Sequence, residues 1–454
     1  MKSRLLAVYV GMVAGIFVAV PVAEQESDLS ADSSFTMALT GDSIITRKLS
    51  VYAEPSFIEM IELLRGADVA FTNIEMLFHD YESYPMSSSG GTYMRASPEL
   101  TKDLVWAGID LGSLANNHSG DYGPPAMLRS ADYVRKAGIV AAGVGKSLAE
   151  AREAKFLETS KGRVALVSVS STFPDHSRAG RSRDDVPARP GLNPLRYSTR
   201  YVVTRERLES LRATMEDLGF ETQESSDELT LFGGQHFVAG DVSAVLTEPD
   251  PQDMAEIASV VSNASRLADY TIVTIHAHER DKELSVPAKF LVTFARAMIE
   301  AGADVFVGHG PHVLRGIEIH QGKPILYSLG DFIFQNETLL RLPQENYKRY
   351  GLGARSHVAD FNDARYDGDT IGFPAKPEIW ESVIAVPSWK DGSLERLELH
   401  PISLGYGQPR QVRGRPMLAE ADLSRKIISD LQRVSRPFGT KIDYVDGIGI
   451  VDLK

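Results

Sequence analysis

The feature that most constrains the fold is a junction that recurs along the chain, where a helix-like segment ends at a glycine and an apolar run follows at once. It occurs in LLRGADVAF, VWAGIDLGSL, VRKAGIVAAG and IEAGADVFVG, at Gly66, Gly108, Gly138 and Gly302. Glycine adopts the left-handed conformation that ends many helices without steric cost. The preceding segments place apolar side chains on one helical face, as Phe290, Phe294 and Met298 do. The pattern predicts alternating helices and strands, rather than an all-β fold or a helical bundle.

The apolar runs predict strands over residues 36–40, 69–72, 111–115, 164–169, 271–275, 304–307 and 325–329. Polar residues of the types that bind metals follow nearly every one of these runs. They are Asp42, Asn73, Glu75, Asn117, His118, His276, His278, His309, His312 and Asp331. Because ligands in open α/β sheets bind at the carboxyl ends of the strands, these side chains are expected to converge on one rim.

The chain contains no cysteine, so thiolate metal sites, thiol nucleophiles and disulfides are ruled out. Metal ligands must then be His, Asp, Glu or Asn, a set that suits Zn, Mn or Fe. The candidates are Asp42, Glu75, Asn117, His276, His309 and His312. Each residue alone has another explanation: a helix N-cap for Asp42, a buried hydrogen-bonded pair for Asn117 and His118, or a turn for the histidines.

Two further histidines are candidates for catalysis. His118 could donate a proton to a leaving group or hold the substrate. His276 and His278 stand two residues apart, so a continuing strand would project both rings from one face. One ring could then bind the metal while His278 supports the substrate.

The net charge of −13 argues against a nucleic-acid partner, since such partners are attracted by a positive field. An anionic substrate must therefore be held by a metal or by local positive groups. The alternation breaks over about 175–250, a segment with a helix near 205–218 and an arginine-rich stretch, RAGRSRDDVPARPGLNPLRYSTRY. Arg189 and Arg196 in this stretch could clamp a polyanion, and a solvated surface loop is the alternative.

The rest of the chain gives three structural expectations. Residues 338–380 read as an irregular loop or lid whose aromatic residues either line a site or pack the loop. A hairpin is expected to turn at Asp391 and Gly392, because Asp-Gly suits a type I′ turn. An amphipathic helix through Leu423, Ile427 and Leu431 and one final strand within 441–454 would complete residues 381–454.

The amino terminus has the features of an export signal. Lys2 and Arg4 precede an uncharged, mostly apolar run from Leu5 to Val20. We expect a periplasmic or cell-surface protein in which residues 1–23 are either a cleaved signal or a signal anchor, followed by a linker over 24–34.

Several motifs together resemble the CapA family of bacterial capsule and poly-γ-glutamate synthesis proteins. They are GDSIITR, TNIEMLF, LANNHSGDYG, GVGKSLAEAR, IHAHE, GHGPHVLRGIEIHQGKPILYSLGDFIF and SRPFGTKI. That family is similar in fold to calcineurin-like metallophosphoesterases. The resemblance implies an α/β (α+β) four-layer sandwich, two β-sheets flanked by helices, formed mainly by residues 35–337.

The resemblance also assigns roles to residues. It implies that Asp42, Glu75 and Asn117 supply metal ligands, and that His276, His309 and His312 supply nitrogens to one or two divalent ions. It makes His118 the proton donor or anion contact and Asp121 the residue that orients it. Asn73 and Arg95 are added to Arg189 and Arg196 as candidate substrate contacts.

The chain departs from the phosphoesterase pattern at named positions. Ile44 stands where that pattern has a histidine, and His309 and His312 are three residues apart rather than two. Gly310 replaces a further histidine of many CapA relatives, and Glu279 is one position out of register. These departures predict that one of two metal positions is depleted.

The expected function is an exported, metal-dependent hydrolase-like protein acting in capsule or γ-glutamyl polymer synthesis, release or processing. Three alternatives remain: a phosphomonoesterase or phosphodiesterase, a non-catalytic membrane-tethered subunit that binds polymer or a synthase complex, and a metal-free peptide epimerase.

Overall fold

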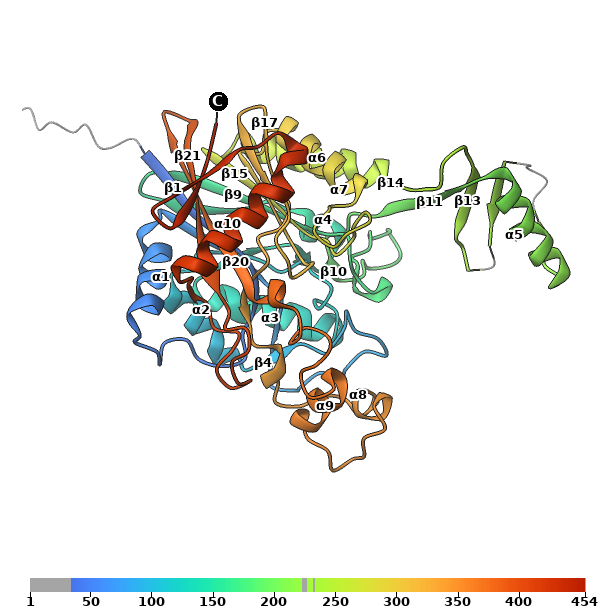
Figure 1. Cartoon of the computed structure of the whole chain (residues 1–454), viewed down its shortest axis with the longest axis horizontal. Helices are drawn as coiled ribbons and strands as arrows, with labels where there is room; N and C mark the ends of the chain where they lie inside the picture. The colour runs from blue at the N-terminus through green and yellow to red at the C-terminus, as the bar shows by residue number, and fades with distance from the viewer. Residues whose placement is uncertain (1–33, 223–226, 232, 454) are drawn as a thin grey trace, which may run out of the picture. The chain divides into compact units, whose positions relative to one another are not determined.

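Two β-sheets pack face to face, and helices cover the outer face of each (Figure 1). The computed structural model describes residues 34–222, 227–231 and 233–453. The predicted export signal lies outside the described residues. Within those residues, no helix is both long enough and apolar enough to span a bilayer.

The larger sheet has ten strands, eight of them in the order β23-β24-β21-β20-β1-β2-β5-β6, with β19 beside β1 and β22 beside β21. Their bounds are β1 Ser34–Ile44, β2 Val69–Ile74, β5 Leu111–Ser113, β6 Val140–Ala142, β19 Asp331–Phe334, β20 Glu381–Lys390, β21 Ser393–Ser403, β22 Met417–Leu418, β23 Ile442–Val445 and β24 Ile448–Val451. Strands β1, β2, β5 and β6 run parallel, so their carboxyl ends share one edge.

The smaller sheet has the order β17-β18-β16-β15-β9-β8. Its strands are β8 Lys155–Thr159, β9 Gly162–Ser170, β15 Tyr270–His276, β16 Val305–His309, β17 Ile317–His320 and β18 Lys323–Leu326. The central strands β9, β15, β16 and β18 are parallel, and their carboxyl ends also share one edge. All seven strands predicted from the apolar runs are present.

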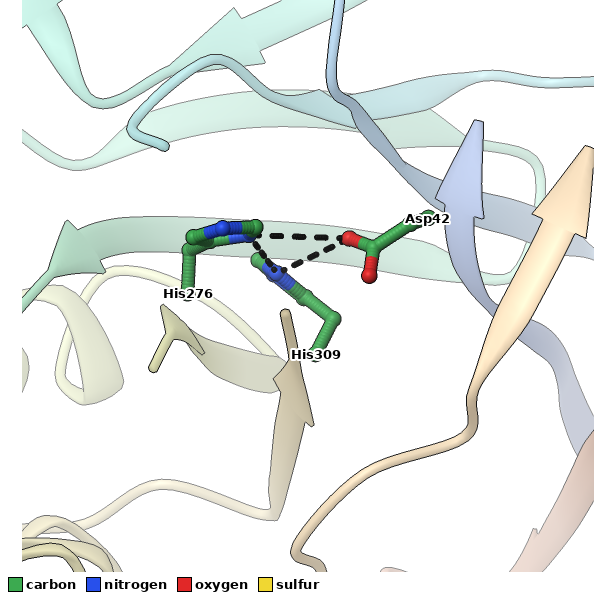
Figure 2. Close-up of side chains that lie close together, drawn as sticks. All are labelled: Asp42, His276 and His309. Carbon is green, nitrogen blue, oxygen red and sulfur yellow. Dashed lines mark hydrogen bonds and ion pairs between the residues drawn. The ribbon is translucent and has the colours of Figure 1, made fainter. Parts of the chain in front are cut away.

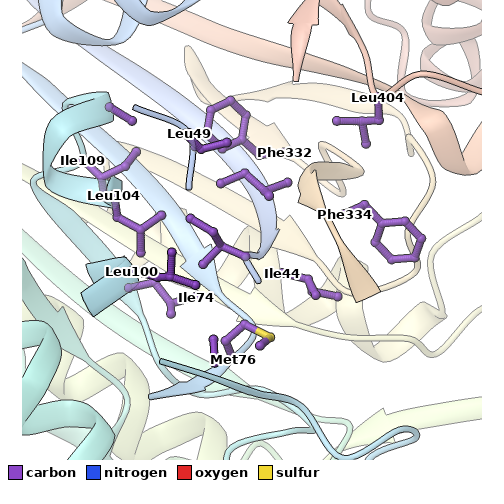
Figure 3. Packing of buried hydrophobic residues seen from close by; sticks show 14 of the residues in the cluster. Ile44, Leu49, Ile74, Met76, Leu100, Leu104, Ile109, Phe332, Phe334 and Leu404 are labelled. Carbon is purple, nitrogen blue, oxygen red and sulfur yellow. The ribbon is translucent and has the colours of Figure 1, made fainter. Parts of the chain in front are cut away.

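Three apolar clusters form the layers. The cluster between the sheets includes Phe35 and Leu39 of β1 and Val307 of β16. Outside the larger sheet, a second cluster packs against helices α1 Pro55–Gly66, α2 Thr101–Ala107 and α3 Gly123–Ala137 (Figure 3). A third lies under α6 Pro251–Ser265 and α7 Lys289–Glu300. The four-layer sandwich is confirmed, because α1, α2 and α3 bury apolar faces on the larger sheet and α6 and α7 bury theirs on the smaller one.

Three of the four predicted glycine junctions are left-handed, with φ of 102° at Gly108, 109° at Gly138 and 118° at Gly302. The prediction was wrong for Gly66. That residue is the last residue of α1, and the chain leaves the helix through Ala67 in an extended conformation.

The arginine-rich segment contains a small sheet that its sequence did not reveal. The expected helix is α5 Arg205–Asp217, and it packs on a sheet of order β12-β13-β11-β14 through Leu208, Met215 and Leu229. The strands are β11 Tyr197–Val203, β12 Glu228–Thr230, β13 His236–Ala239 and β14 Ala244–Pro249. They are short and largely polar, so their periodicity is weak.

The carboxyl-terminal expectations are partly confirmed. β20 and β21 form the hairpin, with φ of 51° at Asp391 and 76° at Gly392 as a type I′ turn requires. The amphipathic helix is α10 Ala421–Ser435. The tail forms two short strands, β23 and β24, rather than one, because it turns back at Gly447. Residues 338–380, expected to be irregular, include α8 Gln344–Arg349 and α9 Val358–Tyr366.

Candidate metal centre

Strand register brings the predicted ligands together in pairs. Asp42, near the end of β1, is opposite Asn73 of β2 and opposite Asp331 of β19. In the smaller sheet, His276 and His309 are register partners at the ends of β15 and β16. Since the parallel strands of both sheets end on the same side of the interface, these pairs meet in one buried cluster.

One group of ligand atoms is formed by Asp42, His276 and His309 (Figure 2). The Nδ1 atoms of the two histidines are 3.1 Å apart, and Oδ1 of Asp42 lies 3.6 Å from that of His276 and 3.5 Å from that of His309. All three side chains are fully buried.

Thr274 sets the tautomer of His309. The Thr274 hydroxyl donates to the Val307 carbonyl at 2.8 Å, so its oxygen accepts from Nε2 of His309 at 2.7 Å. The lone pair of His309 is then on Nδ1, which faces Asp42 and His276. A histidine held in this way by its other nitrogen is typical of metal ligands.

Two more groups share residues with the first. One contains Glu75, His276 and His278, and the other contains Asp42, Glu75, His312 and Asp331. Nε2 of His276 lies 3.0 Å from Nε2 of His278, so His276 faces two groups. A neutral imidazole has a lone pair on one nitrogen only, so His276 can bind a metal in one group at a time. Asp42, with two oxygens, can serve two groups at once.

Buried acceptor atoms without a hydrogen-bond partner test whether these residues fit a cation. Among the described residues, they include both carboxylate oxygens of Glu75, Oδ2 of Asp331 and the amide oxygens of Asn73 and Asn117. Leaving such oxygens buried and unpaired is costly unless a cation or a donor satisfies them. The donor set of carboxylate, amide and imidazole atoms therefore fits a divalent ion of the Zn, Mn or Fe class.

Burial and mutual repulsion shift the pKa values in the cluster. Burial raises the pKa of Glu75, and the charge of Asp42 raises it further. Burial lowers the pKa of His276 and of His278, and brings that of His309 to about 3. Burial also opposes protonation of His312, but Asp331, 2.8 Å from its Nδ1, outweighs that effect together with Glu75 and Asp42, and the pKa rises to about 10. His276, His278 and His309, whose pKa values are lowered, stay neutral and keep a lone pair available for a metal.

His118 and Asp121 form a pair beside the cluster. Nδ1 of His118 lies 2.8 Å from Oδ2 of Asp121, and its Nε2 lies 3.7 Å from Glu75. Asp121 is fixed in turn by the backbone N–H groups of Gly90, at 3.1 Å, and Met94, at 2.8 Å. The geometry leaves Nε2 of His118 as the atom that can exchange a proton with a bound molecule.

A cavity of about 230 Å³ opens onto this cluster. Its lining includes Asn117, His118, His278 and His312, together with Ile44 and apolar or neutral groups from several loops. Ile44 also belongs to the apolar cluster under the larger sheet (Figure 3). The position that holds histidine in the phosphoesterase pattern is thus an apolar part of the wall.

The corner at residues 309–312 is held in an unusual backbone conformation. His312 has a φ of 59°, which is rare for a residue other than glycine, and Gly310 has a φ of 117°. The Gly310 N–H donates to Oδ2 of Asp42 at 2.8 Å. A Cβ on Gly310 would lie 3.0 Å from the Ala277 nitrogen, so this corner is built for glycine.

Of the four predicted substrate contacts, Asn73 lies within the ligand cluster and the three arginines lie away from its cavity. The Asn73 amide donates to Oδ1 of Asp42 at 2.7 Å, within the cluster itself. Arg95 is buried, donates to Asp80 at 2.8 Å and lies over the Tyr81 ring. None of Arg95, Arg189 and Arg196 lines the cavity at the cluster.

The two arginines of the 175–250 segment are engaged with their own surroundings. Arg196 pairs with Asp253 at 2.8 Å and with Asp250 at 3.3 Å. Arg189 donates to the Arg178 carbonyl at 2.9 Å and lines a separate surface cavity with other arginines. The structure therefore does not bring them to the ligand cluster.

Several contributors were missed at the level of sequence. Asp331 was expected on the rim but not as a ligand, and it joins a ligand group; Thr274 orients His309; and Gly90 contacts the Asn117 loop so closely that a Cβ would lie 2.3 Å from the Asn117 carbonyl oxygen. The Gly-Gly pair at 90–91 was the available signal, since adjacent glycines mark a turn or loop and lack the side chains that would prevent a close backbone approach. Glu279 accepts hydrogen bonds from Ser171 at 2.7 Å and Thr172 at 2.9 Å, outside the ligand groups.

Comparison with known proteins identifies related chains. The profile of a family described as "Bacterial capsule synthesis protein PGA_cap" matches residues 36–336. The uncharacterized protein y4sH of Sinorhizobium fredii is 38% identical over 92% of this chain and 93% of its own length. The PGA biosynthesis protein CapA of Bacillus subtilis is 25% identical over 65% of this chain and 66% of its own. The capsule biosynthesis protein CapA of Bacillus anthracis is 22% identical over 69% of this chain and 62% of its own length.

Proposed function

Because the chain belongs to the bacterial capsule synthesis family PGA_cap, which has a metallophosphoesterase-like fold, we propose that it is a metal-dependent hydrolase of an anionic γ-glutamyl polymer. The observation that carries the proposal is the buried cluster in which the oxygens of Glu75, Asp331 and Asn117 have no hydrogen-bond partner beside neutral histidines. A bound divalent ion would stabilise these buried oxygen and imidazole groups, because it would satisfy the acceptor atoms that have no donor.

The ligand groups contain Asp42, Glu75, His276, His278, His309, His312 and Asp331, and Asn117 offers an amide oxygen beside them. A divalent ion held there would act as a Lewis acid toward water and toward the oxygen of the scissile group.

The chain's own residues complete the reaction. Hydrolysis adds the elements of water across the scissile bond, so the leaving amine or alcohol needs a proton. His118 lines the cavity and can donate that proton from Nε2, while Asp121 holds its Nδ1 and stabilises the charged ring. His278, also on the cavity wall, can contact the substrate.

The test pairs metal content with turnover. Asp42→Asn and His276→Ala should each lower the metal retained per chain and lower hydrolysis of a γ-glutamyl oligomer at least a hundredfold. His320→Ala removes a histidine that pairs with Glu300 at 3.1 Å, outside the cluster, and should change neither measurement. Full activity in either cluster variant would refute the proposed role of the metal.

The fold favours a second candidate, phosphoester hydrolysis, which the apolar Ile44 in the cavity wall disfavours. Turnover of p-nitrophenyl phosphate far above that of the γ-glutamyl oligomer would select it. Polymer binding without turnover of either substrate would select a non-catalytic accessory role, in which a membrane synthase complex is the partner.

Export is the remaining part of the proposal. It is supported by the basic and apolar residues from Lys2 to Val20. Fractionation of cells that produce the full chain should place it outside the cytoplasm, and removal of residues 1–23 should retain it inside.

A further inference from the structure

Two cations on the wall of the metal-cluster cavity have no assigned role. Arg365, at the end of α9, and Lys376, eleven residues later, both line the cavity, as His118 and His312 do. Arg365 is half-buried and Lys376 is exposed. Both lie beyond residues 36–336, the part of the chain that the family profile matches.

Neither cation is neutralised within the described part of the chain. No carboxylate of the described residues forms an ion pair with Arg365 or Lys376. By contrast, Arg410 pairs with Asp363 at 2.6 Å and Asp369 at 2.7 Å, and Arg413 pairs with Glu337 at 2.6 Å. Among these neighbouring cations, the unpaired charges are the two that face the cavity.

Packing fixes the Arg365 guanidinium in position. It donates to the Thr92 hydroxyl and lies between the rings of Phe361, Tyr366 and Phe373, with ring centroids 5.9, 5.0 and 5.7 Å away. Aromatic faces attract a guanidinium without neutralising it, so the group remains available to an anion.

The segment that carries these cations is anchored to the sandwich. The Asn362 amide donates to the Glu337 carbonyl at 2.8 Å, and the Asn336 amide donates to the Tyr366 hydroxyl at 3.3 Å. The Phe373 ring also packs against the His312 ring, with centroids 5.4 Å apart. Arg365 is therefore held at a defined place relative to the ligand cluster.

We propose that Arg365 and Lys376 form the substrate-anion site of this cavity and bind the free carboxylates of a γ-glutamyl chain whose scissile bond lies at the metal cluster. The proposal rests on the proposed function. A protein with a net charge of −13 needs local positive groups to hold a polyanion, and these two stand at the cavity itself. Arginine also matches the planar carboxylate with two parallel hydrogen bonds.

The experiment measures equilibrium binding, so that it does not depend on turnover. A γ-glutamyl pentamer and its side-chain-amidated counterpart are titrated into the metal-loaded full chain by calorimetry. Arg365→Gln and Lys376→Gln should each weaken pentamer binding about tenfold or more, since each removes a charge-assisted contact. Neither should change the affinity for the amidated pentamer, and Arg365→Lys should restore part of the lost affinity.

Matched controls come from the same segment. Arg349→Gln and Lys348→Gln make the same charge changes on the exposed side of α8, away from the cavity lining, and should change pentamer affinity less than twofold. Metal content and the melting temperature of every variant report folding separately.

The outcomes separate the two proposals. Parent-like binding by both Arg365→Gln and Lys376→Gln, or equal parent affinity for the two pentamers, would overturn the anion site. Loss of metal or turnover in Asp42→Asn with pentamer binding retained supports the anion site whatever the reaction is. A parent chain that binds the pentamer but holds no metal would refute the proposed function alone.

Discussion

Glu75 shows how strongly a single residue can indicate a ligand. It is fully buried, both of its oxygens lack a hydrogen-bond partner, and Asp42 and Asp331 repel its negative charge. Burying one unpaired carboxylate costs about 3 kcal/mol or more, and the negative charges of Asp42 and Asp331 beside it add to that cost unless a cation compensates. The cluster is therefore a site whose stability and charge state depend on what it binds.

Asp331 should control both His312 and the metal. We expect Asp331→Asn to lower the pKa of His312 from about 10, because the opposing carboxylate is lost while burial remains. Metal affinity should fall about tenfold to a hundredfold, as it does when a ligand or its partner is removed. NMR titration of 13C-labelled histidine in metal-free protein and a chelator competition assay measure the two effects.

The matched control for Asp331→Asn is Glu300→Gln, which breaks a histidine–carboxylate pair, that of His320, outside the cluster. It should leave metal affinity unchanged. An unaltered His312 pKa in Asp331→Asn would contradict the assigned cause.

Metal affinity should rise with pH. Glu75, Asp331 and His312 have raised pKa values, so the metal-free cluster holds protons that a divalent ion must displace. The pKa of His309 is about 3, so that residue releases no proton at neutral pH. Between pH 6 and 8, affinity should increase up to about tenfold per pH unit for each proton released. Calorimetry in two buffers of different ionisation enthalpy counts the protons, and affinity that falls with pH would exclude this charge assignment.

At the level of the elements, the close approach of β1 to β19 positions the centre. Asp42 is opposite Asp331 in register, and the Asp42 N–H donates to the Gly330 carbonyl at 3.0 Å. A Cβ on Gly41 would lie 1.8 Å from the Gly330 oxygen, which is backbone and cannot rotate away. Glycine is required there because the strands that carry two ligands must pass so close together.

Gly41→Ala should therefore destabilise the fold by about 2 kcal/mol or more, since overpacking that moves backbone costs roughly 1–3 kcal/mol. The midpoint of urea unfolding measures this change. Gly66→Ala is the control, because Gly66 ends α1 with no atom near its added Cβ. It should stabilise the fold by about 0.5–1 kcal/mol through the lower entropy of the unfolded chain. Equal midpoints for the two variants would contradict the close approach.

At the scale of the whole molecule, the sandwich and the small sheet of the 175–250 segment have separate cores. Leu208, Met215 and Leu229 form the small core with other residues of that segment. Against α7, Tyr197 stacks on Phe290 with centroids 4.3 Å apart, and the Phe290 N–H donates to Thr247 at 3.1 Å. The ligand cluster draws no residue from the small sheet.

Excising the small sheet should leave the metal centre intact. Arg200 and Leu246 are antiparallel register partners, so residues 201–245 can be replaced by an Asn-Gly turn that keeps Tyr197 and Thr247. We expect parent-like metal content and a melting temperature within about 4 °C of the parent, because a loss of about 1 kcal/mol shifts a large domain by 2–4 °C. Loss of metal from a folded excised chain would show that the segment shapes the centre.

The sequence alone determined the alternation of helices and strands, the seven predicted strands and the residues that follow them. These are local properties: an apolar run, a glycine after a helix and an Asp-Gly pair each favour one local geometry whatever the rest of the chain does. Gly66 marks the limit, since a glycine permits a left-handed cap without requiring it.

Only the tertiary structure decided which polar residues meet. Asp42 and Asp331 become neighbours because two parallel strands far apart in the sequence adopt one register, and Thr274 selects the His309 tautomer across β15 and β16. The cations that line the cavity are Arg365 and Lys376. Arg189 contacts its own segment and Arg196 pairs with Asp253 of α6, so neither reaches the cavity. Distances between remote residues depend on how the whole chain packs, and no local pattern encodes them.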